Sequence, residues 1–195
     1  MITTSLQHKY RSNASSRWLS HICGKKIYLI HRMATRHAYA RNFQYKILNN
    51  SLYLNNRLAL FGLATTTNCS FCGLFSETID HLFVDCSYTK LLWQALSNHF
   101  SPDLIFPPLN SQNVHLGFLD DKIDNFLLLN HMLLIFKIYI YNCRAAKKLP
   151  FAGLLARIEK IYNLESRSQE YRANAIYDVK WRCIAPALSR NDGLI

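Results

Sequence analysis

The stretch NCSFCGLFSETIDHLFVDC, from Asn68 to Cys86, carries four side chains of the kinds that bind metal ions in proteins. The spacing is Cys-x2-Cys-x8-His-x4-Cys, and the candidate ligands are Cys69, Cys72, His81 and Cys86. Two residues between cysteines suit a tight turn that directs both sulfurs at one ion, and Gly73 allows the backbone a positive φ. Three thiolates and one imidazole favour Zn²⁺ in a closed, structural site. The alternative is that these cysteines are simply small buried residues.

The second half of this stretch predicts where a helix must end. Residues 78–85 have the apolar spacing of a helix, but five residues of α-helix turn through about 500°, which leaves His81 and Cys86 about 140° apart. We therefore expect the helix to end near Asp85. Cys86 can then turn back to the metal before the next helix begins around Ser87.

The sequence on either side predicts further helices. Apolar spacing indicates two basic helices within residues 22–48, a short helix ending at Gly62, and an amphipathic helix directly after Cys86. The apolar face expected for this last helix comprises Tyr88, Leu91, Leu92, Ala95, Leu96, His99 and Phe100.

The C-terminal half predicts one extended segment and more helices. The segment NVHLGFL, 113–119, is predicted to be extended, and residues 126–141 to form an apolar, buried helix with Asp120 and Asp121 as acids at its start. Another helix is expected after Pro150, and residues 165–183 are expected to be helical.

These elements predict a mainly α fold: a helical domain with a CCHC zinc knuckle between helices. We expect a polar N-terminal tail over residues 1–20 and basic helices plus the knuckle over 21–101. A C-terminal helical extension is expected over 102–195.

The charge of the chain is unevenly distributed. The net charge is +11, and the first 76 residues hold ten Lys or Arg and not one acid. Such a region favours a polyanionic partner. Because the bases alternate with aromatic residues and no lipidation motif accompanies them, we expect nucleic acid rather than a membrane. The phosphate contacts are predicted at Lys25, Lys26, Arg32, Arg36, Arg41 and Lys46.

The N-terminus lacks the apolar core of a secretory signal, so we expect an intracellular, reducing compartment. The six cysteines are then not expected to form a disulfide framework. Residues 126–141 are short for a membrane span and contain Asn130, His131 and Lys137.

The segment CSFCGLFSETIDHLFVDCSYTKLLW, Cys69 to Trp93, resembles the zinc-binding domain at the C-terminal end of reverse transcriptases from LINE-type (non-LTR) retrotransposons. The family pattern has a Cys-x2-Cys pair, then Glu-Thr-x2-His, then x4-Cys and a helix with a Trp. Here those positions are Cys69, Cys72, Glu77, Thr78, His81, Cys86 and Trp93. The flanking segments extend the resemblance over roughly residues 40–165.

The resemblance implies an accessory region that acts on the RNA or the genomic target of a self-copying element. The polymerase and endonuclease of such proteins lie elsewhere in a far longer chain, so we expect no enzyme activity from this one. One alternative is a scaffold that docks onto the polymerase core.

A second alternative is the remnant of a restriction-like endonuclease, with Pro102, Asp103, Asp178 and Lys180 as candidate residues. We interpret Asp178 and Lys180 instead as part of a solvated face. The Phe-x-Asp-Asp pattern at Phe118–Asp121 resembles a polymerase metal motif, but in the family that motif precedes the knuckle. The histidines outside the knuckle are interpreted as surface or packing residues.

Overall fold

The computed structural model describes residues 24–168 and 179–189, and this part of the chain is mostly helical, as predicted. Its only extended pairing is an isolated antiparallel bridge between Asn68 and Ser76. The predicted tail, with His8 and His21, lies outside the described residues, as do Asp178 and the side chains of Lys25 and Lys26. The helices are α3 (Gly24–Ala34), α4 (Ala38–Leu48), α5 (Asn55–Leu60), η1 (His81–Asp85), α6 (Ser87–Phe100), α7 (Ser111–Leu116), α8 (Phe126–Cys143), α9 (Phe151–Arg167) and α12 (Ala185–Ser189).

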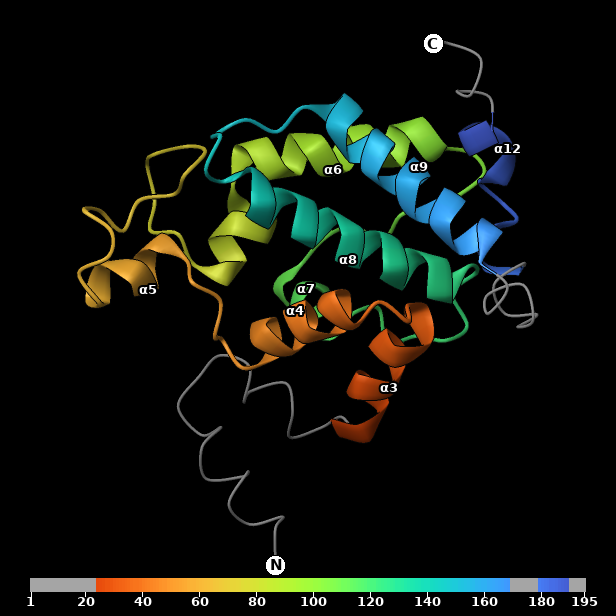
Figure 1. The fold of residues 1–195 in the computed structure, drawn as a ribbon, viewed down its shortest axis with the longest axis horizontal. Coiled ribbons are helices and arrows are strands. Elements are labelled where there is room, and N and C mark those ends of the chain that lie inside the picture. The colour runs from red at the N-terminus through yellow and green to blue at the C-terminus, as the bar shows by residue number, and fades with distance from the viewer. Residues whose placement is uncertain (1–23, 169–178, 190–195) are drawn as a thin grey trace, which may run out of the picture.

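Helix α8 forms the centre of the fold. It contacts α3, α4 and α9, and the other helices surround it while α5 projects to one side (Figure 1). A helix that is apolar on all sides is stable only if neighbours cover it. By length and composition α8 could also cross a membrane, but 72% of it is buried inside the protein. The prediction of a buried core helix is therefore confirmed.

The segment predicted to be extended, residues 113–119, is instead mostly helical: α7 covers Ser111–Leu116. The side chains of Asn110 and Asn113 each accept a hydrogen bond from the other residue's backbone N–H, forming a reciprocal cap. Gly117, with φ +83°, ends the helix. The prediction was wrong because capping at both ends outweighs the short alternation of apolar residues.

Asp120 and Asp121 were expected at the start of α8, and this placement was also wrong. The helix begins at Phe126, after Asn125 in the left-handed conformation, and its first turn contains no acid. Both aspartates are exposed in the preceding turns, where the Asp120 carboxylate accepts a hydrogen bond from the Lys122 backbone.

Lys180 was expected on a solvated face but is buried, with 4% of its surface exposed. Its ammonium donates hydrogen bonds to Glu165 (2.7 Å), His131 (3.0 Å) and the carbonyl of Ala34 (3.1 Å). Trp181 also donates to Glu165. The prediction failed because the charge pattern of one segment cannot show that the fold places a buried carboxylate, Glu165 of α9, next to Lys180.

A second buried lysine, Lys137 of α8, donates hydrogen bonds to Gln44 (2.5 Å) and to the carbonyl of Val114 (2.9 Å). Gln44 in turn donates to the carbonyl of His115. This network joins α4, α7 and α8. Burial lowers the pKa of Lys137 to about 7.

We expect Lys137 to make stability depend on pH. Because its folded pKa of about 7 lies below the ordinary 10.5, the unfolded chain binds more protons than the folded chain between these two values. Stability from this residue therefore rises with pH across that window, by at most about 1.4 kcal/mol per pH unit. Denaturant unfolding of Lys137→Met at pH 7 to 9 should lack this rise, whereas the exposed-residue control Lys148→Met should keep it. Equal slopes in both variants would contradict the assignment.

Candidate metal centre

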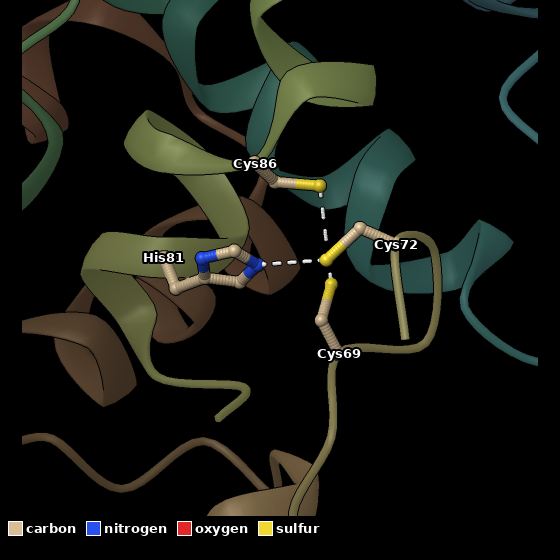
Figure 2. Close-up of side chains that lie close together, drawn as sticks. All are labelled: Cys69, Cys72, His81 and Cys86. Atoms are coloured by element: carbon tan, nitrogen blue, oxygen red, sulfur yellow. Dashed lines mark hydrogen bonds between the residues drawn. The ribbon is translucent and has the colours of Figure 1, made fainter. Parts of the chain in front are cut away.

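The structure brings the four predicted ligands together. The Sγ atoms of Cys69, Cys72 and Cys86 and a ring nitrogen of His81 lie within 4.8 Å of one another. Figure 2 shows the four side chains converging from a loop on one side and from η1 and its end on the other. The Sγ atoms of Cys69 and Cys86 are 3.9 Å apart, and Cys72 Sγ lies 3.3 Å from His81 Nε2.

These distances fit a tetrahedral zinc site. With Zn–S near 2.3 Å and Zn–N near 2.0 Å, two ligand sulfurs should lie about 3.8 Å apart, and a sulfur and a nitrogen about 3.5 Å apart. The two observed separations lie within a few tenths of an ångström of these values. The ligands would be the three Sγ atoms and His81 Nε2. A bound zinc ion would supply a cross-link between the loop and η1.

The first two ligands lie in a tight loop that backbone hydrogen bonds hold closed. Cys69 N–H donates to the carbonyl of Phe75 (2.7 Å), beside the Asn68–Ser76 bridge. Gly73 N–H donates to the carbonyl of Cys69 (2.9 Å), and Gly73 has φ +69°, the conformation that glycine adopts at least cost. The loop therefore directs Cys69 and Cys72 to the same point.

The other two ligands are joined by a π-helical turn. The N–H of Cys86 donates to the carbonyl of His81 (2.8 Å), which is an i to i+5 bond, and Cys86 itself has extended backbone angles. The wider turn places residue i+5 above residue i, which removes the angular conflict expected for an α-helix. The helix ends at Asp85 and α6 begins at Ser87, as the spacing predicts.

A hydrogen bond from Cys69 to Cys86 joins two of the ligand thiols. The hydrogen bond that Cys69 donates raises its own pKa to about 12 and lowers the pKa of the acceptor Cys86 to about 7. Because metal ligands must be deprotonated, metal binding displaces the proton of this hydrogen bond and becomes tighter as the pH rises.

Glu77 holds the loop of Cys69 and Cys72 in place from the interior of the protein. Its position next to the following helix suggests only a favourable charge at the helix N-terminus, but the structure gives it this further role. Its carboxylate is fully buried and accepts hydrogen bonds from the backbone N–H groups of Ser70 (2.7 Å) and Asn55 (3.0 Å). It also pairs with Arg144 at the end of α8, at 2.5 Å. Burial alone would raise the pKa of Glu77, but the hydrogen bonds from Ser70 and Asn55 and the charge of Arg144 hold it below 4.5.

The knuckle, residues 69–86, is also fixed to the helical core. Leu82 and Phe83, between the last two ligands, are fully buried, and Thr89 of α6 donates to the carbonyl of Leu82 (2.7 Å). One turn further along α6, the ring of Trp93 makes edge contacts with Phe106 and Phe136. These contacts hold the knuckle and the start of α6 against the core around α8.

The predicted phosphate-binding residues differ in how accessible they are. All three of Arg32, Arg36 and Lys46 are exposed. Arg32 lies on α3, Arg36 lies between α3 and α4, and Lys46 lies on α4. Arg41 is half-buried, and its guanidinium donates to the carbonyl of Arg36. Lys25 and Lys26 belong to α3, but their side chains lie outside the described part.

Comparison with known proteins agrees with the geometry of this site. No curated protein and no solved structure matches the chain significantly. One family model does match, over a segment that includes α3, α4, α5 and all four ligands and ends at Trp93. Residues 7–93 match the family described as zinc-binding in reverse transcriptase.

Proposed function

We propose that this chain is a zinc-stabilised, nucleic-acid-binding accessory region of a reverse transcriptase from a LINE-type retrotransposon, without catalytic activity of its own. The zinc and reverse-transcriptase context rests on the family match and the Cys₃His cluster. The nucleic-acid role rests on a further observation: Arg32, Arg36 and Lys46 are exposed in a region, residues 1–76, that contains no acid.

Helices α3 and α4 each bury an apolar side and leave these basic side chains exposed on another side. On α4 the apolar side chains Phe43 and Ile47 are buried against the core, so Lys46 projects from another side of the helix. On α3 the buried residues are Ile27 and Ile30, and Arg32 lies on the exposed side. The bases therefore sit at the surface while the same helices anchor them. Cations held in this way contact phosphates and confer affinity with little choice of sequence.

This role predicts that the affinity for nucleic acid falls steeply with salt and that the three exposed bases cause much of this fall. Replacing Arg32, Arg36 and Lys46 together by Glu should weaken binding of RNA and DNA and reduce the slope of log K against log salt by about two to three. The measurement is fluorescence anisotropy of a labelled oligonucleotide between 50 and about 300 mM salt.

The matched control reverses three other exposed lysines, Lys90, Lys122 and Lys148, which changes the net charge equally but at residues outside α3 and α4. An equal loss in both variants would show that only overall charge matters and would contradict a defined phosphate-binding surface.

A second candidate is docking onto the reverse transcriptase core. It is favoured by large apolar side chains that are more than half exposed around α5 and at the tip of the knuckle loop, namely Leu60, Phe61, Leu63, Leu74 and Phe75. In Figure 1, α5 and the adjoining loops project from the helical body. Two results together would favour docking instead. Binding of nucleic acid would depend little on salt, and binding to the polymerase core would resist salt and be abolished by Leu60→Ser and Leu74→Ser.

A further inference from the structure

A pocket is lined by residues of α8, of the start of α4 and of the middle and second half of α9, and none of its described lining residues belongs to the knuckle. Figure 1 shows the three helices that contribute to it. Its volume is about 270 Å³. Ligand pockets usually measure about 300–1,000 Å³, so this one is sized for a single small unit.

The floor of this pocket is apolar and its edge is aromatic. Ile135 and Ile138 of α8 are buried and form this floor, and Ile161 and Leu164 line the pocket from α9. The ring of Tyr39, on the first turn of α4, lines the same pocket with 58% of the residue exposed. An apolar floor with an accessible aromatic ring suits a flat ring such as a nucleobase, because bases stack on aromatic side chains whatever their sequence.

The polar lining of the pocket is cationic or neutral. Arg157 and Lys160 lie one turn apart on α9, and no carboxylate is among the described residues that line the pocket. The Nε atom of Arg157 is buried and has no hydrogen-bond partner within the described structure. A buried donor left unpaired costs free energy, and an anion bound beside this guanidinium would compensate its charge.

The histidines of the lining face a different group. His131 accepts a hydrogen bond from Lys180, and the nearby carboxylate of Glu165, 3.8 Å from His37, already accepts bonds from Lys180 and Trp181. Those bonds engage Oε2 of the carboxylate, whereas Oε1 makes no hydrogen bond within the described structure. Glu165 itself is not among the described residues that line the pocket, and Arg157 and Lys160 are. Helix α4 also begins here, with no acid in its first turn and no side-chain cap. Its N-terminal N–H groups add to the attraction for an anion.

A second hollow continues from the pocket along α9. It shares Lys160 and Leu164 and extends to Arg167, and Glu159 is the one carboxylate among the described residues of its lining. A chain of phosphates leaving the pocket would follow Lys160 and Arg167.

We propose that this pocket binds one nucleoside 5′-phosphate unit, with the base between Tyr39 and the apolar floor and the phosphate at Arg157 and Lys160. The unit is either a free nucleotide or an unstacked nucleotide of a single strand. The second source rests on the nucleic-acid role proposed above and would make the chain prefer single strands, because bases in a duplex are not free to enter.

The test compares Tyr39→Ala/Lys160→Glu with the matched control Tyr88→Ala/Lys90→Glu. The control changes a tyrosine of similar exposure (52%) and an exposed lysine on α6. Calorimetry with AMP reads the pocket alone, and anisotropy with a single-stranded dT oligonucleotide and a duplex of equal length reads nucleic acid. We expect saturable AMP binding in the wild type and the control. The pocket variant should lose it, with single-strand affinity about tenfold weaker and duplex affinity changed less.

The outcomes separate this inference from the proposed function. If nucleic acid binds but the pocket variant and the control behave alike toward AMP and single strands, the pocket assignment is overturned while the nucleic-acid role stands. AMP binding without binding of any strand would retain the pocket as a site for free nucleotide and overturn the nucleic-acid role. Stronger competition by an acidic aromatic peptide than by AMP would show a protein-binding pocket instead.

Discussion

Replacing Cys72 by serine is expected to abolish stoichiometric zinc binding and to disorder the knuckle. Cys72 Sγ lies 3.3 Å from His81 Nε2, in a cluster where each side chain supplies one of four ligand atoms. A structural zinc ion supplies about 10 kcal/mol or more of folding free energy, and three ligands hold it much less tightly than four. Because Leu82 and Phe83 lie between two of the ligands and are fully buried, loss of the ion should also loosen the start of α6.

Three measurements check this expectation: metal content of the purified protein, thermal melting with and without a strong chelator, and hydrogen exchange over residues 68–86. The matched control is Cys183→Ser, the same change at a half-buried cysteine outside the cluster, which should keep one zinc per chain. Unchanged metal content in Cys72→Ser, or melting of the wild type that the chelator does not affect, would contradict a structural zinc site.

Replacing Glu77 by alanine is expected to destabilise the protein by about 3–5 kcal/mol. The carboxylate is fully buried, and its loss leaves the guanidinium of Arg144, which is 12% exposed, without its counter-charge. It also leaves the N–H groups of Asn55 and Ser70 without their acceptor. Since Ser70 lies between Cys69 and Cys72, the same change should weaken zinc binding. Denaturant unfolding and zinc competition measure the two effects.

The control for Glu77→Ala is Asp85→Ala, which removes an exposed carboxylate from the same knuckle and should cost little. A double-mutant cycle of Glu77→Gln with Arg144→Met should show that the two losses are not additive, because each partner is buried against the other. Additive losses, or a cost for Glu77→Ala below about 0.5 kcal/mol, would show that the pair does not brace the knuckle.

The pH dependence of the stability of Glu77→Gln gives an independent check. The folded pKa of Glu77 lies below 4.5, so its contribution is complete above that value and is lost as the pH falls through the folded pKa. The stability gap between wild type and Glu77→Gln should therefore narrow on acidification.

The spacing of the ligands predicted much of the local structure around the site. The end of the helix at Asp85 and the start of α6 at Ser87 follow from the need for His81 and Cys86 to reach one point. The π-helical turn that achieves it was not predicted, because the spacing requires a departure from the α-helix and does not specify which. The short helix before Gly62 and the basic helices α3 and α4 were also predicted.

The buried face of α6 shows how much of a helix's burial the apolar periodicity of the sequence predicts. Leu92, Leu96 and Phe100 are buried as expected, but Tyr88 and Leu91 are more than half exposed. Thr89 and Trp93 are buried beside the expected stripe. The apolar pattern identifies the helix, and the neighbours it packs against decide how far the helix is rotated about its axis.

By itself the sequence determined the helical class, the order of the main helices, the four side chains able to hold a metal ion, and the basic character of the first third. These properties depend on periodicity, on spacing within one segment and on composition, which a chain carries before it folds. The tertiary structure alone decided which charges are buried and with what partners: Glu77 with Arg144, and Glu165 with Lys180. It also decided that α4, α8 and α9 enclose a pocket. Such pairings join residues far apart in the chain, and only packing of the whole core determines whether water or another side chain meets each charge.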